Sequence, residues 1–519
     1  MTQRRLVHAV IIGAVRLTSR HLPAIHQPTV RTRTSMGTRR ALGVTSASQL
    51  ISFALNLLNV IVVARLLTPS EIGVFSVAVS FQAIVHVFRE FGVNQYLVQA
   101  TSVAEDDFRA AFTLTLMFSW TVALFLFVGS GPLSVFYNHD GVATVLALLA
   151  VNFLLMPFGT PSLGMLVREL RFERLAAIRI ANLSTATIVT ITAAWLGQSY
   201  LSMVWGAIAG QIANLVAVSI ARPQGILMLP TLKGVRSIFR FGSISSAATL
   251  IQELGRSAPD LILGRTLGFS AVAYYSRAAG LRDMLLGQLV AVVNGVHFPT
   301  FAQAIRDGAD PAELYTRATT YLIGVTIPFL ALLALLAEPL ILFFFGDQWL
   351  VSAPLAALLC LFAIFTAPYA LARLSLIASG QVSSVLYLEC VVQAIRIAVL
   401  LTSIWLPLER VVPLLGIVAA IEAAAYQYGL RRYLGVGFAQ LWKSIATASV
   451  LSFLTLLGPG LLWLSPIADA DSMSMRFSLL ALSGLTALGA WVAGLFLLKH
   501  PLREELVNVI STAVRFVRR

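Results

Sequence analysis

The sequence has little charge, few cysteines and very few lysines. Only 12% of its 519 residues are charged, whereas about 25% are charged in a typical soluble domain. Its two cysteines, Cys360 and Cys390, lie in apolar runs, which excludes a disulfide framework and a multi-cysteine metal site. The histidines show no HExxH spacing, so we expect no catalytic metal. No GxxxxGK[ST] phosphate loop is present, and none of Lys233, Lys443 and Lys499 follows a glycine, which argues against an ATP-driven pump.

Long apolar runs fill most of the chain, which is 58% apolar and has a mean hydropathy of +0.84. A membrane-spanning helix needs about 20 mainly apolar residues. By this criterion the sequence predicts an all-α polytopic membrane protein with about fourteen transmembrane helices. The predicted spans are 41–64, 73–97, 109–129, 141–165, 177–197, 200–221, 241–264, 270–297, 316–337, 351–372, 382–405, 409–430, 443–465 and 477–498.

Basic residues are distributed unevenly between the two sides that these spans define. With the N-terminus in the cytoplasm, 28 of the 37 basic residues fall on the cytoplasmic side and five lie within spans. Only Arg65, Arg265, Arg410 and Arg476 fall on the external side. Because cytoplasmic loops are enriched in Lys and Arg, we predict that both termini are cytoplasmic. The positive charge is then expected to contact anionic membrane lipid rather than nucleic acid.

The two ends of the chain are basic. Residues 1–40 hold eight arginines and no acidic residue, and the short apolar stretch 6–15 is followed by no small-residue cleavage site. We expect a cytoplasmic extension that lies on the membrane, with an organellar transit peptide as the alternative. Translation starts at Met1 or at Met36. Residues 499–519 are predicted to form an amphipathic helix at the cytoplasmic interface.

An internal repeat relates the two halves of the chain. Residues 46–78 and 246–278 align without a gap, nine of the 33 positions are identical, and both copies contain Arg-x-Leu-x-x-Ser after an apolar span. Six spans separate the copies, so both halves enter the membrane in the same direction, as in transporters built from parallel repeats. We therefore predict an N-lobe (41–221), a cytoplasmic linker (222–240), a C-lobe (241–432), two further spans (443–498) and the tail.

Polar side chains at helical spacing predict a hydrated cavity between the lobes. The neutral polar lining would consist of Gln49, Ser52, Asn56, Asn59, Gln252 and Gln393. The cationic lining would consist of Arg89, Arg256, Arg277, Arg282 and Arg396. An arginine facing lipid at the bilayer centre costs about 2.5–3.5 kcal/mol, so these residues must face water or a partner. Their guanidinium groups suit the oxygens of a phosphate.

Acidic residues in the spans offer a way to couple transport to an ion gradient. A carboxylate buried in apolar surroundings tends to keep its proton, which suits proton exchange. The candidates for binding H⁺ or Na⁺ are Glu90, Glu253, Asp260, Glu389 and Glu422. The alternative is structural ion pairing, for example among Glu253, Arg256 and Asp260 on one helix face. No other cofactor is expected.

Five ordered segments resemble the polysaccharide transporter family, which contains the O-antigen and exopolysaccharide flippases of the multidrug/oligosaccharidyl-lipid/polysaccharide (MOP) superfamily. They are ARLLTPSEIGVFSVAVSF (64–81), FREFGVNQYLVQ (88–99), VRELRFERLA (167–176), PDLILGRTLGFSAVAYYSRAAGL (259–281) and LAEPLILFFFGDQWLVSAP (336–354). The resemblance spans about 41–440. Arg256, Asp260 and Arg265 match its seventh-helix stretch, and Arg277 matches the arginine of "YSR". Pro259 departs from the family pattern, which puts the role of Asp260 in doubt.

The resemblance implies a V-shaped bundle of two six-helix lobes, with two extra C-terminal helices, in the bacterial inner membrane. It implies that the chain is not an enzyme and flips polyprenyl-pyrophosphate-linked oligosaccharides by alternating access around a cationic cavity. Polysaccharide polymerase and co-polymerase are the implied partners. A cation-coupled multidrug exporter of the same superfamily is the main alternative, although span 41–64 has no acidic residue. A membrane glycosyltransferase or polymerase is disfavoured, because no long external loop carries a pair of acidic residues. A scaffold protein that transports nothing is the remaining alternative.

Overall fold

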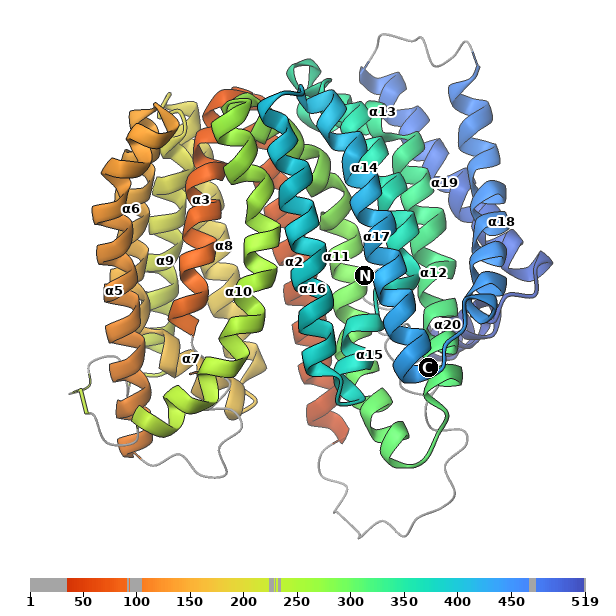
Figure 1. Ribbon diagram of the computed structural model, residues 1–519, viewed down its shortest axis with the longest axis horizontal. Helices are drawn as coiled ribbons and strands as arrows, with labels where there is room; N and C mark the ends of the chain where they lie inside the picture. The colour runs from red at the N-terminus through yellow and green to blue at the C-terminus, as the bar shows by residue number, and fades with distance from the viewer. Residues whose placement is uncertain are drawn as a thin grey trace. The chain divides into compact units, whose positions relative to one another are not determined.

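The computed structural model describes residues 35–90, 105–223, 235–465 and 473–517, with the separate positions 93, 228, 230 and 231. These residues form helices joined by short turns, and no strand occurs among them (Figure 1). The all-α prediction is therefore confirmed. Most of the predicted N-terminal extension lies outside the described residues.

The helices, in chain order, are α2 (Ser35–Leu66), α3 (Pro69–Glu90), α5 (Glu105–Tyr137), α6 (Asp140–Leu155), η1 (Met156–Phe158), α7 (Thr160–Arg168), α8 (Phe172–Trp195), α9 (Leu201–Ala221), α10 (Val235–Thr266), α11 (Phe269–Arg306), α12 (Pro311–Leu335), α13 (Ala337–Phe345), η2 (Asp347–Trp349), α14 (Ser352–Thr366), η3 (Ala367–Tyr369), α15 (Ala372–Ala378), α16 (Val382–Leu401), η4 (Thr402–Ile404), α17 (Leu408–Leu434), α18 (Phe438–Trp463), α19 (Met473–Leu497) and α20 (Leu502–Val517).

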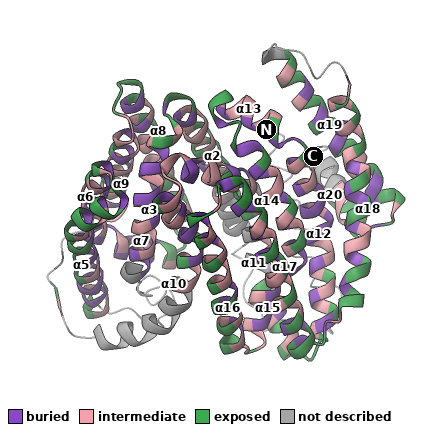
Figure 2. Ribbon diagram, turned by 45° about the horizontal axis from the view of Figure 1, so that its top comes forward, coloured by how far each residue is buried: buried purple, intermediate pink, exposed green. Residues whose placement is uncertain are grey.

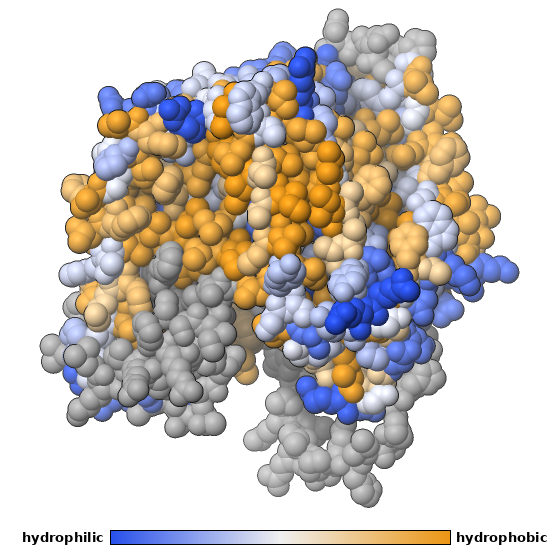
Figure 3. Space-filling view, viewed as in Figure 1, coloured by the Kyte–Doolittle hydropathy of each residue, from blue (hydrophilic) through white to orange (hydrophobic). Residues whose placement is uncertain are grey.

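Eleven segments of the described chain are long and apolar enough to cross a membrane, and each coincides with a predicted span. The other three predicted spans, 241–264, 270–297 and 409–430, fall on α10, α11 and α17, which are helical throughout them. The total of fourteen stays a prediction. Figure 3 shows a broad apolar surface bordered by hydrophilic side chains, the pattern that contact with lipid tails requires.

The helices pack as two compact units that divide at Ala273. The first unit contains α2 to α10 and the first residues of α11, and the second contains the rest of α11 and the helices up to α20. The sequence repeat places span 241–264 at the start of the C-lobe, but the helix that contains it, α10, packs against α3 and α5. The repeat and the packing thus group this helix differently, and the predicted lobe bounds stay a prediction.

Close helix packing in the first unit depends on small residues of α9. α8 and α9 form its most extensive helix pair. A Cβ atom added at Gly206 would lie 1.8 Å from Oγ1 of Thr190 and 2.8 Å from the carbonyl oxygen of Ala186. One turn further on, Asn182 donates a hydrogen bond of 2.9 Å to the carbonyl oxygen of Gly210. Glycine thus lets the two backbones approach closely, as is common between membrane helices.

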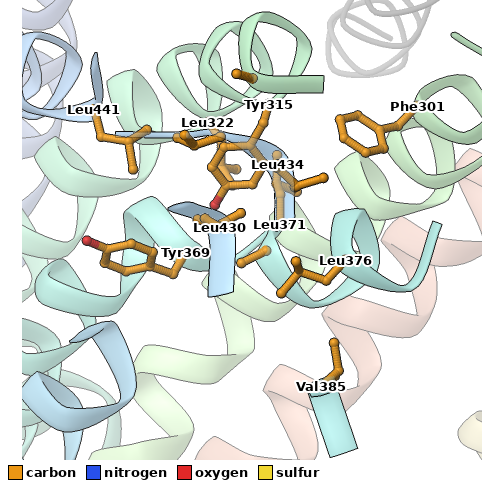
Figure 4. Packing of buried hydrophobic residues seen from close by; sticks show 13 residues of the cluster. Phe301, Tyr315, Leu322, Tyr369, Leu371, Leu376, Val385, Leu430, Leu434 and Leu441 are labelled. Atoms are coloured by element: carbon orange, nitrogen blue, oxygen red, sulfur yellow. The ribbon is translucent and has the colours of Figure 1, made fainter. Parts of the chain in front are cut away.

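The core of the second unit lies where α11, α12, α15 and α17 meet (Figure 4). Tyr315 at its centre is fully buried, and its hydroxyl donates a 2.8 Å hydrogen bond to the carbonyl oxygen of Pro368. Leu322, Leu371 and Leu430 pack in the same cluster. This bond satisfies a polar group that would be costly to leave unpaired away from water.

The C-terminal helices pack on this unit through α12. α18 buries Leu441, Ala448 and Leu451 against the protein (Figure 2). Its side chains Phe453 and Leu461 are exposed, so the same apolar helix also has a surface that suits contact with lipid.

The C-terminal tail forms the predicted helix, α20, and a buried histidine precedes it. The His500 ring packs on Gly324 of α12, and Trp491 of α19 donates a 2.9 Å hydrogen bond to the carbonyl oxygen of Gly324. Burial lowers the pKa of His500, which keeps the ring neutral in this joint. The cytoplasmic position of α20 stays a prediction.

The α8–α9 contact gives a test of the packing. We expect Gly206→Ala to lower the stability of the protein by about 1–3 kcal/mol, because the new methyl group collides with backbone and a short side chain. Thermal unfolding in detergent, followed by the fraction of monodisperse protein, would measure the loss. Gly489→Ala in α19 is the matched control, since no atom lies within 4 Å of the added Cβ there. Equal stability of the two variants would contradict the packing described for α8 and α9.

Candidate functional site

The predicted polar face of the first span lies on α2, which is helical without interruption. Gln49 and Asn56 are exposed, Asn59 is half-buried and Ser52 is buried. Ser52 Oγ and Asn59 Oδ1 are buried atoms without a hydrogen-bond partner in the part of the chain that the structure describes. Spacings of three and four residues put the four side chains on one helix face, as expected. This face offers neutral hydrogen-bonding groups and no charge.

On α10 the structure bears on the alternative that Glu253, Arg256 and Asp260 neutralise one another. The carboxylate of Asp260 accepts a 2.7 Å hydrogen bond from the hydroxyl of Ser80 on α3. Glu253 is half-buried and accepts a long hydrogen bond, 3.5 Å, from Ser257, whereas Arg256 is exposed. Among the described residues, Arg256 forms no ion pair with either acid. The alternative of structural pairing among Glu253, Arg256 and Asp260 is therefore not seen among the described residues of this helix.

Asp260 is held in place by neutral groups. Pro259 lies inside α10, and the helix continues through it without a break. One residue beyond Asp260, the carbonyl oxygen of Leu261 accepts a 3.0 Å hydrogen bond from the hydroxyl of Tyr137 on α5. Ser80 and Tyr137 thus join α10 to two neighbouring helices at this level. The carboxylate has a hydroxyl partner and, among the described residues, no basic one.

Arg277 of α11 lies against two aromatic rings in the second unit, and these rings also contact each other. Its guanidinium carbon is 5.2 Å from the centroid of Trp349 and 5.6 Å from that of Phe345, within the range of cation–π attraction. Tyr274, one turn earlier, contacts the edge of Trp349. Nε of Arg277 is a buried atom without a hydrogen-bond partner, and no acid pairs with the guanidinium among the described residues. The rings hold this cation in place without neutralising it.

Two ion pairs connect α16 to its neighbours. Nε of Arg373, on α15, donates to Glu389 at 2.7 Å, and Nη2 of Arg396 donates to Glu422, on α17, at 2.9 Å. Glu389 is buried, and the other three side chains keep 28–31% of their surface exposed. Gln393 lies between the two pairs on α16, and its Oε1 is buried without a hydrogen-bond partner among the residues that the structure describes. The expected face of α16 is therefore formed, but both of its charges are already paired.

Other predicted site residues are less informative. Arg282 binds the carboxylate of the adjacent Asp283 through two hydrogen bonds, 2.7 and 2.9 Å long. Gln252 is half-buried on α10. The side chains of Arg89 and Glu90 lie outside the described ones. Of the five predicted arginines, Arg277 is the one that combines burial with the absence of an acidic partner in the described part of the chain.

Sequence reasoning missed four contributors to these sites. Arg373 was assigned to a cytoplasmic loop because it directly follows span 351–372, yet it neutralises Glu389. Ser80 gives no signal of its own, since a serine in an apolar helix is common. Phe345 and Trp349 stand in the segment FFFGDQW, where the density of aromatic residues next to a predicted span was the available signal.

Comparison with known proteins places the chain among polysaccharide biosynthesis proteins. A family model described as "Polysaccharide biosynthesis protein" matches residues 62–354, more than half of the chain. The succinoglycan biosynthesis transport protein ExoT of Rhizobium meliloti (strain 1021) is 27% identical over 340 residues, which are 64% of this chain and 67% of that protein. The lipopolysaccharide biosynthesis protein WzxC of Escherichia coli (strain K12) is 22% identical over 60% of this chain and 63% of its own length. The match thus spans about two thirds of these relatives or slightly less.

Solved structures with a similar fold are transporters of the MOP superfamily. The lipid II flippase MurJ, in an inward closed conformation, superposes with a TM-score of 0.69 and 13% identity, covering 87% of this chain and 98% of that one. A multidrug resistance MATE family transporter, in an inward-facing conformation, gives a TM-score of 0.60 at 13% identity, covering 83% and 99%. These structures show the fold alone. Together with the family match they confirm the resemblance seen in the sequence: the chain belongs to the polysaccharide biosynthesis protein family and is a multi-pass membrane protein with the MOP-superfamily fold.

Proposed function

We propose that this protein flips oligosaccharides linked to a polyprenyl pyrophosphate across the bacterial inner membrane, for the synthesis of a surface or exported polysaccharide. The observation that carries the proposal is Arg277, a cation that lies against Phe345 and Trp349 without an acidic partner among the described residues. An unpaired charge inside a membrane protein is costly and marks a functional site by default. A pyrophosphate supplies the missing anion, and its oxygens match the donors of a guanidinium group.

The chemistry of such a substrate agrees with the two kinds of surface on the helices. A polyprenyl tail contains tens of carbon atoms, each worth roughly 0.8 kcal/mol in the bilayer, so the tail stays in the lipid while the head group crosses. The sugars need hydrogen-bonding groups along their path, and the neutral face of α2 provides amides and hydroxyls. We propose that the two halves expose this path alternately to the two sides. MATE family transporters with a similar fold have been solved in an inward-facing and in an outward-facing conformation, which supports this mechanism.

Ion coupling is a separate part of the proposal, and Asp260 is its strongest candidate. Glu389 and Glu422 are bound to arginines, which favour the charged form of a carboxylate and oppose proton exchange. Asp260 has only the hydroxyl of Ser80 as a partner among the described residues, so gain and loss of a cation there break no ion pair. We therefore assign the binding of H⁺ or Na⁺ to Asp260.

The Arg277 assignment can be tested by removing the charge at nearly constant volume. We expect Arg277→Met to lower the rate of translocation about tenfold or more, since the loss of one charge-assisted contact of 1.5–3 kcal/mol corresponds to such factors. Arg277→Lys should fall in between, because an ammonium group lacks the planar fork of donors. The assay follows a fluorescent polyprenyl-pyrophosphate-linked sugar in proteoliposomes. Arg432→Met, at an exposed arginine that lies beside Tyr433, is the control. Normal translocation by Arg277→Met would refute the assignment.

The Arg396–Glu422 pair separates a structural role from a role in substrate binding. We expect Arg396→Glu to reduce the amount of folded protein in the membrane. Two carboxylates would then face each other at the place where Nη2 of Arg396 and a carboxylate oxygen of Glu422 now pair at 2.9 Å. The exchanged pair, Arg396→Glu with Glu422→Arg, should restore both folded protein and polysaccharide export. Polymer yield, normalised to protein in the membrane, measures the second effect. If the exchanged pair folds well but exports poorly, Arg396 binds substrate directly, as the sequence predicted.

Asp260→Asn tests the coupling. The amide keeps the hydrogen bond with Ser80 but cannot carry a charge, so we expect translocation driven by a proton or sodium gradient to fall at least about tenfold. Translocation of the substrate in the absence of a proton or sodium gradient should persist. Glu253→Gln is the control on the same helix. A wild-type protein that ignores both gradients would remove Asp260 from the mechanism while leaving the flippase proposal intact.

A further inference from the structure

A continuous series of aromatic rings runs along one end of the first unit. Neighbouring rings have centroids 5.0–6.3 Å apart, within the range of favourable edge-to-face and tilted contacts. At one end of the series a guanidinium carbon lies 5.3 Å from the first ring centroid. In spatial order the members are Arg265, Phe136, Tyr137, Phe269, His139 and Tyr200, and they are called the aromatic arc below. They come from the ends of α5 and α10, the starts of α9 and α11, and the turn before α6.

Two tight turns, together with the close contacts that Gly73 and Gly141 allow, position the rings of the arc. Asn138 has a φ of 52° in the turn between α5 and α6, and Gly268 has a φ of 86° between α10 and α11. A Cβ atom added at Gly73 of α3 would lie 1.9 Å from the carbonyl oxygen of Phe269, so only glycine lets α11 begin this close to α3. At Gly141 an added Cβ would meet both the His139 and the Tyr200 rings, at 2.7–2.9 Å. The ring arrangement is therefore fixed by the backbone.

The arc combines exposed ring surface with unused polar atoms. Phe136 is 52% exposed, His139 and Tyr200 are half-exposed, and Tyr137 is buried and contacts the rings of Phe136 and Phe269. Nδ1 of His139 accepts a 3.0 Å hydrogen bond from the backbone N–H of Gly141, so the neutral ring carries its proton on Nε2. Nε2 of His139 and the hydroxyl of Tyr200 form no hydrogen bond with the described residues. Both therefore remain available to a ligand.

This end of the first unit is the one that the distribution of basic residues predicts to be external. Arg265 is one of the four basic residues assigned to that side. Aromatic residues at a membrane interface often serve as anchors in the lipid head groups, and Trp195 at the end of α8, 78% exposed, fits that role. The arc differs from such anchors, because its rings contact one another and surround polar atoms. That arrangement suits a ligand with both apolar and hydroxyl-bearing faces.

We propose that the aromatic arc binds the saccharide part of the lipid-linked substrate on the external side. A pyranose ring presents C–H groups that pack on aromatic faces, and its hydroxyls match the phenol of Tyr200 and the N–H of His139. Arg265, held over Phe136, would bind an acidic substituent on the sugar. The proposal rests on the proposed flippase function and adds to it a site that recognises the sugars after crossing. Such a site interacts with several sugar units, so a longer saccharide gains more from it than a single sugar.

The experiment compares two probes in proteoliposomes: polyprenyl-pyrophosphate-linked glucose and the same lipid carrying a linear tetraglucose. We expect Tyr200→Leu and Phe136→Leu each to raise KM for the tetraglucose probe about fivefold, the size of one lost ring contact, with the glucose probe unaffected. Trp195→Leu, at the exposed tryptophan outside the arc, should change neither. Equal values for wild type and the arc variants, or equal losses with both probes, would overturn the proposal.

Binding of free tetraglucose gives a second measurement that does not depend on transport. Saturation-transfer NMR on the detergent-purified full chain should detect contact of the sugar protons with wild type and with Trp195→Leu, and a contact weakened about fivefold with Tyr200→Leu. A wild-type protein that binds tetraglucose through Tyr200 but moves neither lipid probe would refute the flippase function and keep the arc. Binding that is unchanged in Tyr200→Leu, or absent from wild type, would refute the arc.

Discussion

A charge inside the bilayer has to be paired, hydrated or bound to a ligand, and this constraint organises the polar residues of the second unit. Unpaired, each arginine would cost about 2.5–3.5 kcal/mol at the membrane centre. Arg373 and Arg396 meet the constraint with carboxylates from neighbouring helices, and Arg282 meets it with the adjacent Asp283. These pairs also connect α15, α16 and α17 to one another. The charges paired between helices thus help to specify which helices pack together.

The sequence predicted the helices well because membrane spans depend on local composition. A run of about 20 apolar residues is read without knowing its neighbours, and the eleven apolar segments all fall on predicted spans. The shared face of Glu389, Gln393 and Arg396 was predictable for the same reason, since it follows from the period of one helix. The basic partner of Glu389 was not, because Arg373 lies on α15 and the pair depends on how two helices pack.

The placement of α10 illustrates a second limit of sequence reasoning. The repeat relates residues 246–278 to residues 46–78 and therefore suggests that both helices begin a lobe. A repeat records common ancestry of two segments, whereas packing depends on which side chains fit. α10 fits α3 through the Ser80–Asp260 hydrogen bond and the close approach of Gly264 to Val77. As a result Arg256 belongs to the first unit, although the repeat assigns it to the same half as Arg277 and Arg396.

The contrast between Arg277 and the paired arginines bears on the proposed anion binding, because it shows how a cation can stay available to a ligand. A carboxylate beside Arg277 would stabilise the charge of the guanidinium group. An incoming anion would then have to displace that carboxylate before it could bind. Aromatic rings attract the guanidinium through their electron-rich faces and leave its Nε without a hydrogen-bond partner among the described residues. Arg265 over Phe136 has the same chemistry in the other unit. An arginine that contacts aromatic rings therefore keeps hydrogen-bond donors available to an anionic ligand. An arginine in a salt bridge has those donors already bound to a carboxylate.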